Sequence, residues 1–157
     1  MKIKIEDNLY NDIDRLFIYN TYCNNNKSFN SKWFDKKDLP DCFKNLVEFA
    51  SKEFDLSDVV GYELWTHYNT KPEWHYDKDE HLFNKTGLMK HPICSIVYYP
   101  FVDNLVGGKF MTEDIFITPK TNRAITFSSG VYHNVESYNG ERFSLLLNPW
   151  NYKIKVD

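Results

Sequence analysis

The sequence predicts an α+β fold that is mainly β: a double-stranded β-helix, or jelly roll, with N-terminal helices packed on one outer face. Two observations support this prediction. Helical spacing of apolar residues is confined to residues 1–57, whereas short β-branched and aromatic runs separated by turn residues fill the remainder. The chain of 157 residues suits a single domain. We expect a helical part over 1–57 and a jelly-roll core over about 58–150.

Two helices are expected in the N-terminal part. Apolar residues recur at helical spacing within residues 8–20, at Leu9, Ile13, Leu16 and Phe17. A second helix is predicted to begin near Asp38, a suitable N-cap, and its apolar stripe consists of Phe43, Leu46, Val47, Ala50 and Phe54. Such stripes usually dock a helix on a sheet, so both helices are predicted to pack against the β core.

About eight short strands are expected after residue 57. They are Val59 to Tyr68, Glu73 to Asp77, Ile93 to Tyr99, Gly108 to Met111, Asp114 to Thr118, Ala124 to Phe127, Tyr132 to Ser137 and Arg142 to Asn148. Asn139-Gly140 is the strongest hairpin signal and predicts that the last two strands pair. The long connection at 78–92 is interpreted either as a lid over a substrate or as a solvated loop.

Composition excludes several classes of protein. The formal net charge of -3 provides no basic field for a phosphate backbone, so a nucleic-acid partner is disfavoured. The N-terminus lacks the apolar core of a signal peptide, and no run reaches the roughly 20 apolar residues of a membrane span. We therefore expect a cytoplasmic protein with no membrane partner. The three cysteines are too scattered to indicate a disulfide framework or a zinc site.

A candidate metal site begins with His75 and Asp77. Side chains two residues apart on a strand point to the same face, so an imidazole and a carboxylate can reach one ion. If the fold brings His133 to the same point, the three form a two-histidine, one-carboxylate set, which suits non-haem Fe(II). The other histidines, His67, His81 and His91, are interpreted as structural and are left out of this set.

Arg142 follows His133 by nine residues, and the expected hairpin would place the two side chains beside one cavity. A guanidinium is a rigid fork of donors for a carboxylate, which is what a dicarboxylic cosubstrate requires. Alternation along the last strand then gives two faces. Arg142, Ser144, Leu146 and Asn148 should point into the cavity, whereas Phe143, Leu145 and Leu147 should face the helices. On strand 93–99, Ser95, Val97 and Tyr99 should share one face.

Together these residues resemble the Fe(II)- and 2-oxoglutarate-dependent oxygenases, and within them the prolyl 4-hydroxylase-like branch. The resemblance implies that His75, Asp77 and His133 are the catalytic iron ligands and that Arg142 pairs with the far carboxylate of 2-oxoglutarate. It also implies cosubstrate-binding roles for Tyr99, within Cys94-Ser95-Ile96-Val97-Tyr98-Tyr99, and for Tyr68. Ser144, on the face of Arg142, is a further cosubstrate-binding candidate.

The resemblance implies a hydroxylase that uses Fe(II), 2-oxoglutarate and O2, with ascorbate as a further candidate, and that releases succinate and CO2. Peptidyl proline or another peptide residue is the favoured substrate, and a free amino acid or small metabolite is the alternative. A cupin-like metal-binding protein without 2-oxoglutarate chemistry and a non-catalytic binding module also stay open. A nucleic-acid demethylase of this superfamily would carry a second arginine six residues after Arg142, where this chain has Asn148. The oligomeric state is left open.

Overall fold

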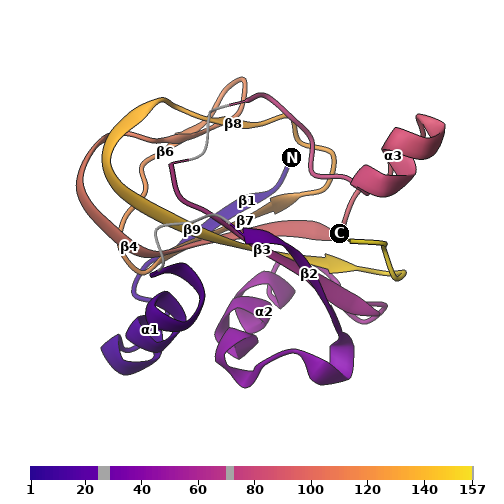
Figure 1. Cartoon of the computed structure of the whole chain (residues 1–157), viewed down its shortest axis with the longest axis horizontal. Helices are drawn as coiled ribbons and strands as arrows, with labels where there is room; N and C mark the ends of the chain where they lie inside the picture. Colours follow the sequence, from indigo (N-terminus) through magenta and orange to yellow (C-terminus); the bar gives the residue numbers. More distant parts are fainter. Residues whose placement is uncertain (25–28, 70–72, 157) are drawn as a thin grey trace.

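The strands of the chain form two antiparallel sheets, which Figure 1 shows in a computed structural model that describes residues 1–24, 29–69 and 73–156. The larger sheet has six strands in the order β1-β7-β4-β9-β3-β2, and the smaller sheet has three in the order β6-β5-β8. Helices α1 and α2 lie on one side of the larger sheet, and β6 and β8 lie on the other. The prediction of a mainly β jelly roll with helices on one outer face is therefore confirmed.

The central strands of the larger sheet were expected from the sequence, but its two edge strands were not. Its members are β1 (Ile3–Glu6), β2 (Phe29–Asp35), β3 (Gly61–His67), β4 (Cys94–Gly107), β7 (Arg123–Ser128) and β9 (Tyr138–Trp150). An edge strand pairs on one side alone and is often short or incompletely buried, so its alternation of polar and apolar residues is weak. β1 has only four residues and none of them is fully buried.

The hairpin predicted at Asn139-Gly140 was wrong. The smaller sheet contains β5 (Phe110–Met111), β6 (Phe116–Ile117) and β8 (Asn134–Val135), so β8 and β9 belong to different sheets. Gly140 lies inside β9 with a φ of 103°, and a Cβ there would collide with the backbone oxygen of Asn104. The glycine therefore permits a close crossing of β9 and β4, next to a register shift between Asp103 and Val106, and not a turn.

Both helices begin later than predicted. α1 (Asp12–Ile18) is capped by Asn11, whose side chain accepts a hydrogen bond from the backbone N–H of Asp14, and a π-helical turn over Tyr19–Cys23 follows. α2 (Lys44–Ser51) is preceded by two 3₁₀ turns, Lys36–Asp38 and Asp41–Phe43. Asp38 lies in the first of these turns and does not cap α2.

The apolar stripe predicted for the first helix was also wrong. Ile13 is 80% exposed and Phe17 is 54% exposed, whereas Ile18 is fully buried. The helix is only seven residues long and passes into the π-helical turn, so the 3.6-residue spacing counted from Leu9 does not describe its buried face.

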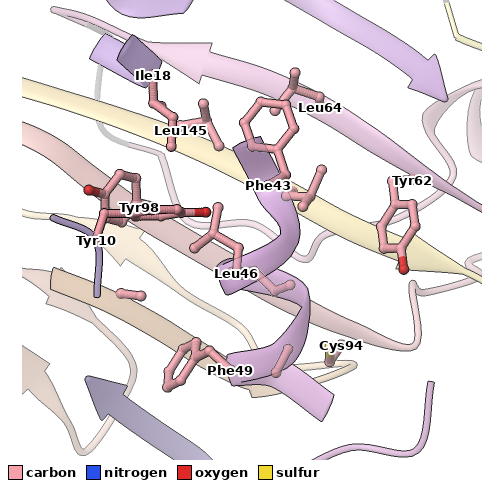
Figure 2. Close-up of a cluster of buried hydrophobic side chains, with 14 of the residues drawn as sticks. Tyr10, Ile18, Phe43, Leu46, Phe49, Tyr62, Leu64, Cys94, Tyr98 and Leu145 are labelled. Atoms are coloured by element: carbon pink, nitrogen blue, oxygen red, sulfur yellow. The ribbon is translucent and has the colours of Figure 1, made fainter. Parts of the chain in front are cut away.

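The core is divided between the two faces of the larger sheet. Figure 2 shows part of the outer cluster, in which side chains of α1 and α2 pack against alternate residues of β3, β4 and β9. The inner cluster lies between the two sheets and contains Val97, Tyr99, Phe110, Ile117, Ile125, Phe127 and Leu146. Cys94, Ile96 and Tyr98 belong to the outer cluster with Phe143, Leu145 and Leu147. The alternation predicted for β4 and β9 is thus confirmed.

The segment 78–92 is not a simple loop. It contains α3 (Glu80–Thr86), which Asp79 caps by accepting a hydrogen bond from the backbone N–H of Leu82 and which ends at Gly87 in the left-handed conformation. The hydroxyl of Tyr152, beyond β9, donates a 2.8 Å hydrogen bond to Asp79 and holds the start of α3 against the C-terminal segment. Among the residues that the structure describes, none forms a helix with the length and apolar character needed to cross a bilayer.

Candidate metal and carboxylate site

His75, Asp77 and His133 lie close together in the structure. One potential ligand atom from each lies within 4.8 Å of the others, which is the spacing of a metal centre. The strand expected over 73–77 is absent, and a single antiparallel bridge joins His75 to His133 through two backbone hydrogen bonds of 3.0 Å. This bridge, rather than a full strand, brings the two imidazoles together.

The backbone orients both imidazole rings. Nδ1 of His75 lies 2.8 Å from the carbonyl oxygen of Glu73, and Nδ1 of His133 lies 2.8 Å from that of Val131. A carbonyl oxygen only accepts hydrogen bonds, so each Nδ1 carries a proton and each Nε2 is the nitrogen that faces the site. Both Nε2 atoms lie 3.4 Å from Oδ1 of Asp77. Metal-binding histidines are commonly held in this way, by a hydrogen bond from the ring nitrogen that does not bind the metal.

The charges of the three groups are coupled. Burial opposes ionisation of Asp77, but hydrogen bonds from His133, His75 and Ser95 prevail and hold the pKa of this carboxyl well below its usual range. Burial lowers the pKa of His75, but its hydrogen bonds to Asp77 and Glu73 outweigh burial and raise it. The carboxylate is therefore ionised and available as a ligand at neutral pH, and a bound cation would displace the proton of His75.

The site is closed on one side and open on the other. His133 is 4% exposed, with Phe127 and Phe110 at ring distances of 4.9 and 5.5 Å. The side chain of His75, by contrast, is 38% exposed. Aromatic rings thus cover the site at His133. Solvent or a substrate can reach it from the side of His75.

Arg142 is a buried cation on the inner face of β9, with 3% of its surface exposed. Its Nε donates to the backbone oxygen of Gly108 at 2.9 Å, Nη1 to Ser144 at 3.4 Å and Nη2 to the hydroxyl of Tyr99 at 3.3 Å. Within the described residues, no carboxylate forms an ion pair with it. A buried charge without a counter-ion is costly, so this guanidinium is suited to an anionic ligand.

Tyr99 adds a neutral donor to this cation. Burial raises the pKa of its phenol more than the charge of Arg142 lowers it, so the hydroxyl stays protonated at neutral pH. Because its oxygen accepts from Arg142, its proton remains free to donate to a ligand. Arg142, Tyr99 and Ser144 thus lie together, as predicted; their roles toward a cosubstrate stay predictions.

Tyr68 does not join this group. It stacks on Phe143 of the outer cluster with a ring distance of 4.6 Å, on the opposite face of the sheet from Arg142. Its neighbour His67 faces inward, where burial and the positive charges of Arg142 and His75 lower its pKa to about 4. Alternation in β3 explains the difference, because Tyr62 and Leu64 belong to the outer cluster and odd-numbered residues face inward. We therefore withdraw Tyr68 from the candidate site.

Two buried polar residues contact the candidate metal site and were not predicted as site residues. Ser95 and Asn148 both hydrogen bond to Oδ2 of Asp77. Alternation had already placed both on the cavity side of their strands, which was the signal that could have identified them. His91, left out as structural, contacts the backbone oxygen of Asp77 through Nδ1 at 2.8 Å and helps to fix the course of the chain there.

Comparisons with known proteins place the fold among the prolyl hydroxylases. No protein-family model matches the chain, and no curated protein matches it in sequence. Solved structures do match. The viral collagen prolyl hydroxylase of Paramecium Bursaria Chlorella virus-1, in its 2OG complex, is 13% identical with a TM-score of 0.68, and the match covers 98% of this chain and 97% of that one.

Two further prolyl hydroxylases resemble the chain over most of its length. A prolyl-4-hydroxylase of Pseudomonas putida is 14% identical with a TM-score of 0.62, covering 96% of this chain and 93% of that one. The prolyl hydroxylase of Trichoplax adhaerens, in complex with a hypoxia inducible factor peptide fragment, is 12% identical with a TM-score of 0.55, covering 95% and 83%. The chain therefore has the prolyl-hydroxylase-like fold of 2-oxoglutarate/Fe(II) oxygenases.

Proposed function

We propose that this protein is an Fe(II)- and 2-oxoglutarate-dependent dioxygenase that hydroxylates a peptide residue, proline being the first candidate, and releases succinate and CO2. One observation carries the proposal. A two-histidine, one-carboxylate set contacts Ser95 at one end of the inner face of β4, and a buried guanidinium with no carboxylate ion pair among the described residues contacts Tyr99 on the same face. A metal-binding protein without a dicarboxylic cosubstrate would have no use for the second feature.

The donor set fits Fe(II). Two imidazole nitrogens and one carboxylate oxygen bind a non-haem ferrous ion and leave positions open for other ligands. His75, Asp77 and His133 would hold the ion, and bound iron supplies the O2 chemistry that couples decarboxylation of the cosubstrate to hydroxylation of the substrate. The aromatic wall of Phe110 and Phe127 keeps water from the His133 side of the site.

Polar groups lie at two ends of the inner face, with apolar side chains between them. On β4, Ser95 contacts Asp77 and Tyr99 contacts Arg142, so the two ends are separated by four residues, or ~13 Å along the strand. Apolar Val97 and Leu146, paired across β4 and β9, lie between them. A dicarboxylate with one end at the metal and the other at Arg142 would meet polar, apolar and polar groups in this order.

A peptide substrate is supported by the open side of the metal site. Trp74 and Tyr132, each 39% exposed, stack at a ring distance of 5.3 Å, and Tyr76 packs on Tyr132 at 4.9 Å. These residues flank the two histidines in the sequence. Exposed aromatic faces suit the ring of proline and other apolar side chains. The similar fold of a prolyl hydroxylase in complex with a peptide fragment supports the same choice.

The test is oxygen-dependent turnover. Purified protein is incubated with Fe(II), 2-oxoglutarate and ascorbate, with proline-containing peptides in one set and free amino acids in another, and succinate and hydroxylated product are quantified. We expect succinate formation coupled to peptide hydroxylation. Product from free amino acids alone would overturn the peptide assignment, and no succinate with either set would overturn the enzymatic proposal.

Arg142→Leu distinguishes this enzyme from a cupin-like metalloprotein. The variant should bind metal as the wild type does but lose about 10- to 100-fold or more in apparent affinity for 2-oxoglutarate, since a buried charge-assisted contact is worth about 1.5–3 kcal/mol. Thr66→Val, on the opposite face of the sheet, is the matched control and should change neither property. Unchanged 2-oxoglutarate affinity in Arg142→Leu would rule out the assigned anchor.

A further inference from the structure

The two carboxylate oxygens of Asp77 have different surroundings. Oδ1 lies 3.4 Å from Nε2 of His75 and 3.4 Å from Nε2 of His133. Oδ2 accepts a 2.6 Å hydrogen bond from the hydroxyl of Ser95 and a 3.0 Å hydrogen bond from the amide of Asn148. We propose that Ser95 and Asn148 are positioning residues that fix Asp77 as a one-oxygen metal ligand through Oδ1.

The amide of Asn148 can adopt only one orientation. Its Oδ1 accepts a hydrogen bond from the backbone N–H of Ile96 at 3.3 Å, so its NH₂ group must face Asp77. Asn148 is 1% exposed, and no rotation of the side chain would satisfy both neighbours if the amide were flipped. The donor to Oδ2 is thus fixed by the backbone of β4.

Ser95 is fixed from the same strand. Its side chain is on the inner face of β4 and 1% exposed, and its backbone oxygen accepts a 2.9 Å hydrogen bond from the hydroxyl of Thr126 on β7. An ionised carboxylate only accepts hydrogen bonds, so the Ser95 hydroxyl must donate its proton to Oδ2. Oδ2 of Asp77 therefore accepts hydrogen bonds from two neutral donors, and both donors are held by strands.

The two hydrogen bonds to Oδ2 would determine how Asp77 binds a metal ion. A carboxylate with a free second oxygen can rotate and bind an ion through both oxygens, which would occupy one of the open positions that this donor set leaves. Neutral donors prevent this without adding a positive charge that would weaken cation binding, as an arginine at position 148 would. The inference rests on the metal site of the proposed function and goes beyond it by assigning how Asp77 is held.

The experiment measures Co(II) binding to the metal-free protein in the absence of cosubstrate. Asn148→Leu removes the donor at similar volume, and Ser95→Ala removes the hydroxyl. We expect each to weaken Co(II) affinity by about 10- to 100-fold, the usual effect of losing an outer partner of a metal ligand. We also expect the visible Co(II) absorption to change, because its intensity reports coordination number. Thr66→Val controls for a buried substitution elsewhere in the sheet and should leave both unchanged.

A double-mutant cycle separates positioning from general damage. If Asn148 acts through Asp77, Asn148→Leu should have no further effect on Co(II) affinity in an Asp77→Ala background. An equal effect in both backgrounds, or wild-type affinity and spectrum in Asn148→Leu and Ser95→Ala, would overturn the inference. Failure of the wild type itself to bind Co(II) would instead overturn the proposed metal site.

Discussion

Both faces of the larger sheet carry a buried apolar cluster, but the inner face also holds a buried guanidinium and several polar groups. On β4, Cys94, Ile96 and Tyr98 face α1 and α2, while Ser95 and Tyr99 face the interior of the roll, and all five are at most 1% exposed. The outer face is almost entirely apolar or aromatic. The inner face carries the Arg142 guanidinium and the polar groups that contact it and the carboxylate of Asp77.

The two faces therefore contribute differently to stability and to binding. Burial of apolar area on the outer face stabilises the domain, at roughly 25 cal/mol per Å². Buried polar and charged groups on the inner face contribute little net stability and require partners, which agrees with the ligand-binding role proposed for them. Substitutions on the two faces should therefore separate stability from metal and cosubstrate binding.

The largest effect is expected at the inner face, from Asp77→Ala. It removes a ligand, so metal affinity should fall more than about 100-fold, beyond the usual loss for an outer partner. Metal-dependent formation of succinate should disappear with it. Titration with Fe(II) or Co(II), alongside the turnover assay, measures both.

The control for Asp77→Ala is the far-ultraviolet circular dichroism spectrum of the metal-free protein, which should match the wild type. Retained turnover in a correctly folded Asp77→Ala protein would mean that a different group completes the metal site.

The matching substitution on the outer face is Leu145→Ala. Leu145 is fully buried in the cluster under the helices, and its truncation should lower the free energy of unfolding by about 2–5 kcal/mol through lost burial and a cavity. Urea denaturation measures the change. Under conditions where the variant is folded, its metal affinity should equal that of the wild type; a parallel loss of metal binding would show that the two faces are not independent.

An intermediate effect is expected from pH, through His67 on the inner face. Burial and the charges of Arg142 and His75 lower its pKa from 6.5 to about 4. Between these values the unfolded chain binds more protons than the folded one, so stability is lost as pH falls from 6.5 toward 4. The difference in pKa corresponds to about 3 kcal/mol.

The measurement compares wild type with His67→Gln by urea unfolding between pH 4 and 7. Glu63, whose pKa burial raises to about 7, gives a slope of opposite sign, because stability then falls as pH rises through that range. Both proteins contain Glu63, so the difference between them isolates His67. We expect the wild type to lose more stability than the variant on acidification; parallel curves would contradict a lowered pKa of His67.

Sequence periodicity was informative where a strand is buried on both faces. The two-residue alternation of β4 and β9 placed Tyr99, Arg142, Ser144 and Asn148 inward and Phe143 outward, as the structure has them. This worked because a one-residue shift would place Arg142 in the apolar outer cluster and the apolar outer residues on the polar inner face. Applied to β3, the same rule would have selected His67 and rejected Tyr68.

Long-range pairing was not predictable from local signals. Asn139-Gly140 has the composition of a two-residue hairpin, yet Gly140 serves a close crossing between β9 and β4. His75 and His133 are joined by one bridge whose two backbone hydrogen bonds span 58 residues of chain. Such contacts depend on the whole topology, so the sequence indicated that the two histidines lie together but not the bridge that joins them.

The smallest effect is expected from two threonines on the outer face. Comparing them tests whether a buried hydroxyl there stabilises the protein only when it has a hydrogen-bond partner. The hydroxyl of Thr66 is buried and has no hydrogen-bond partner among the residues that the structure describes, whereas that of Thr126 donates to the backbone oxygen of Ser95 at 2.9 Å. Thr66→Val should be neutral or stabilise the protein by up to about 1 kcal/mol, because it removes an unsatisfied group. Thr126→Val should destabilise it by about 1 kcal/mol, because it removes a hydrogen bond. Urea unfolding of both variants gives the comparison, and equal changes would mean that the Thr66 hydroxyl is satisfied after all.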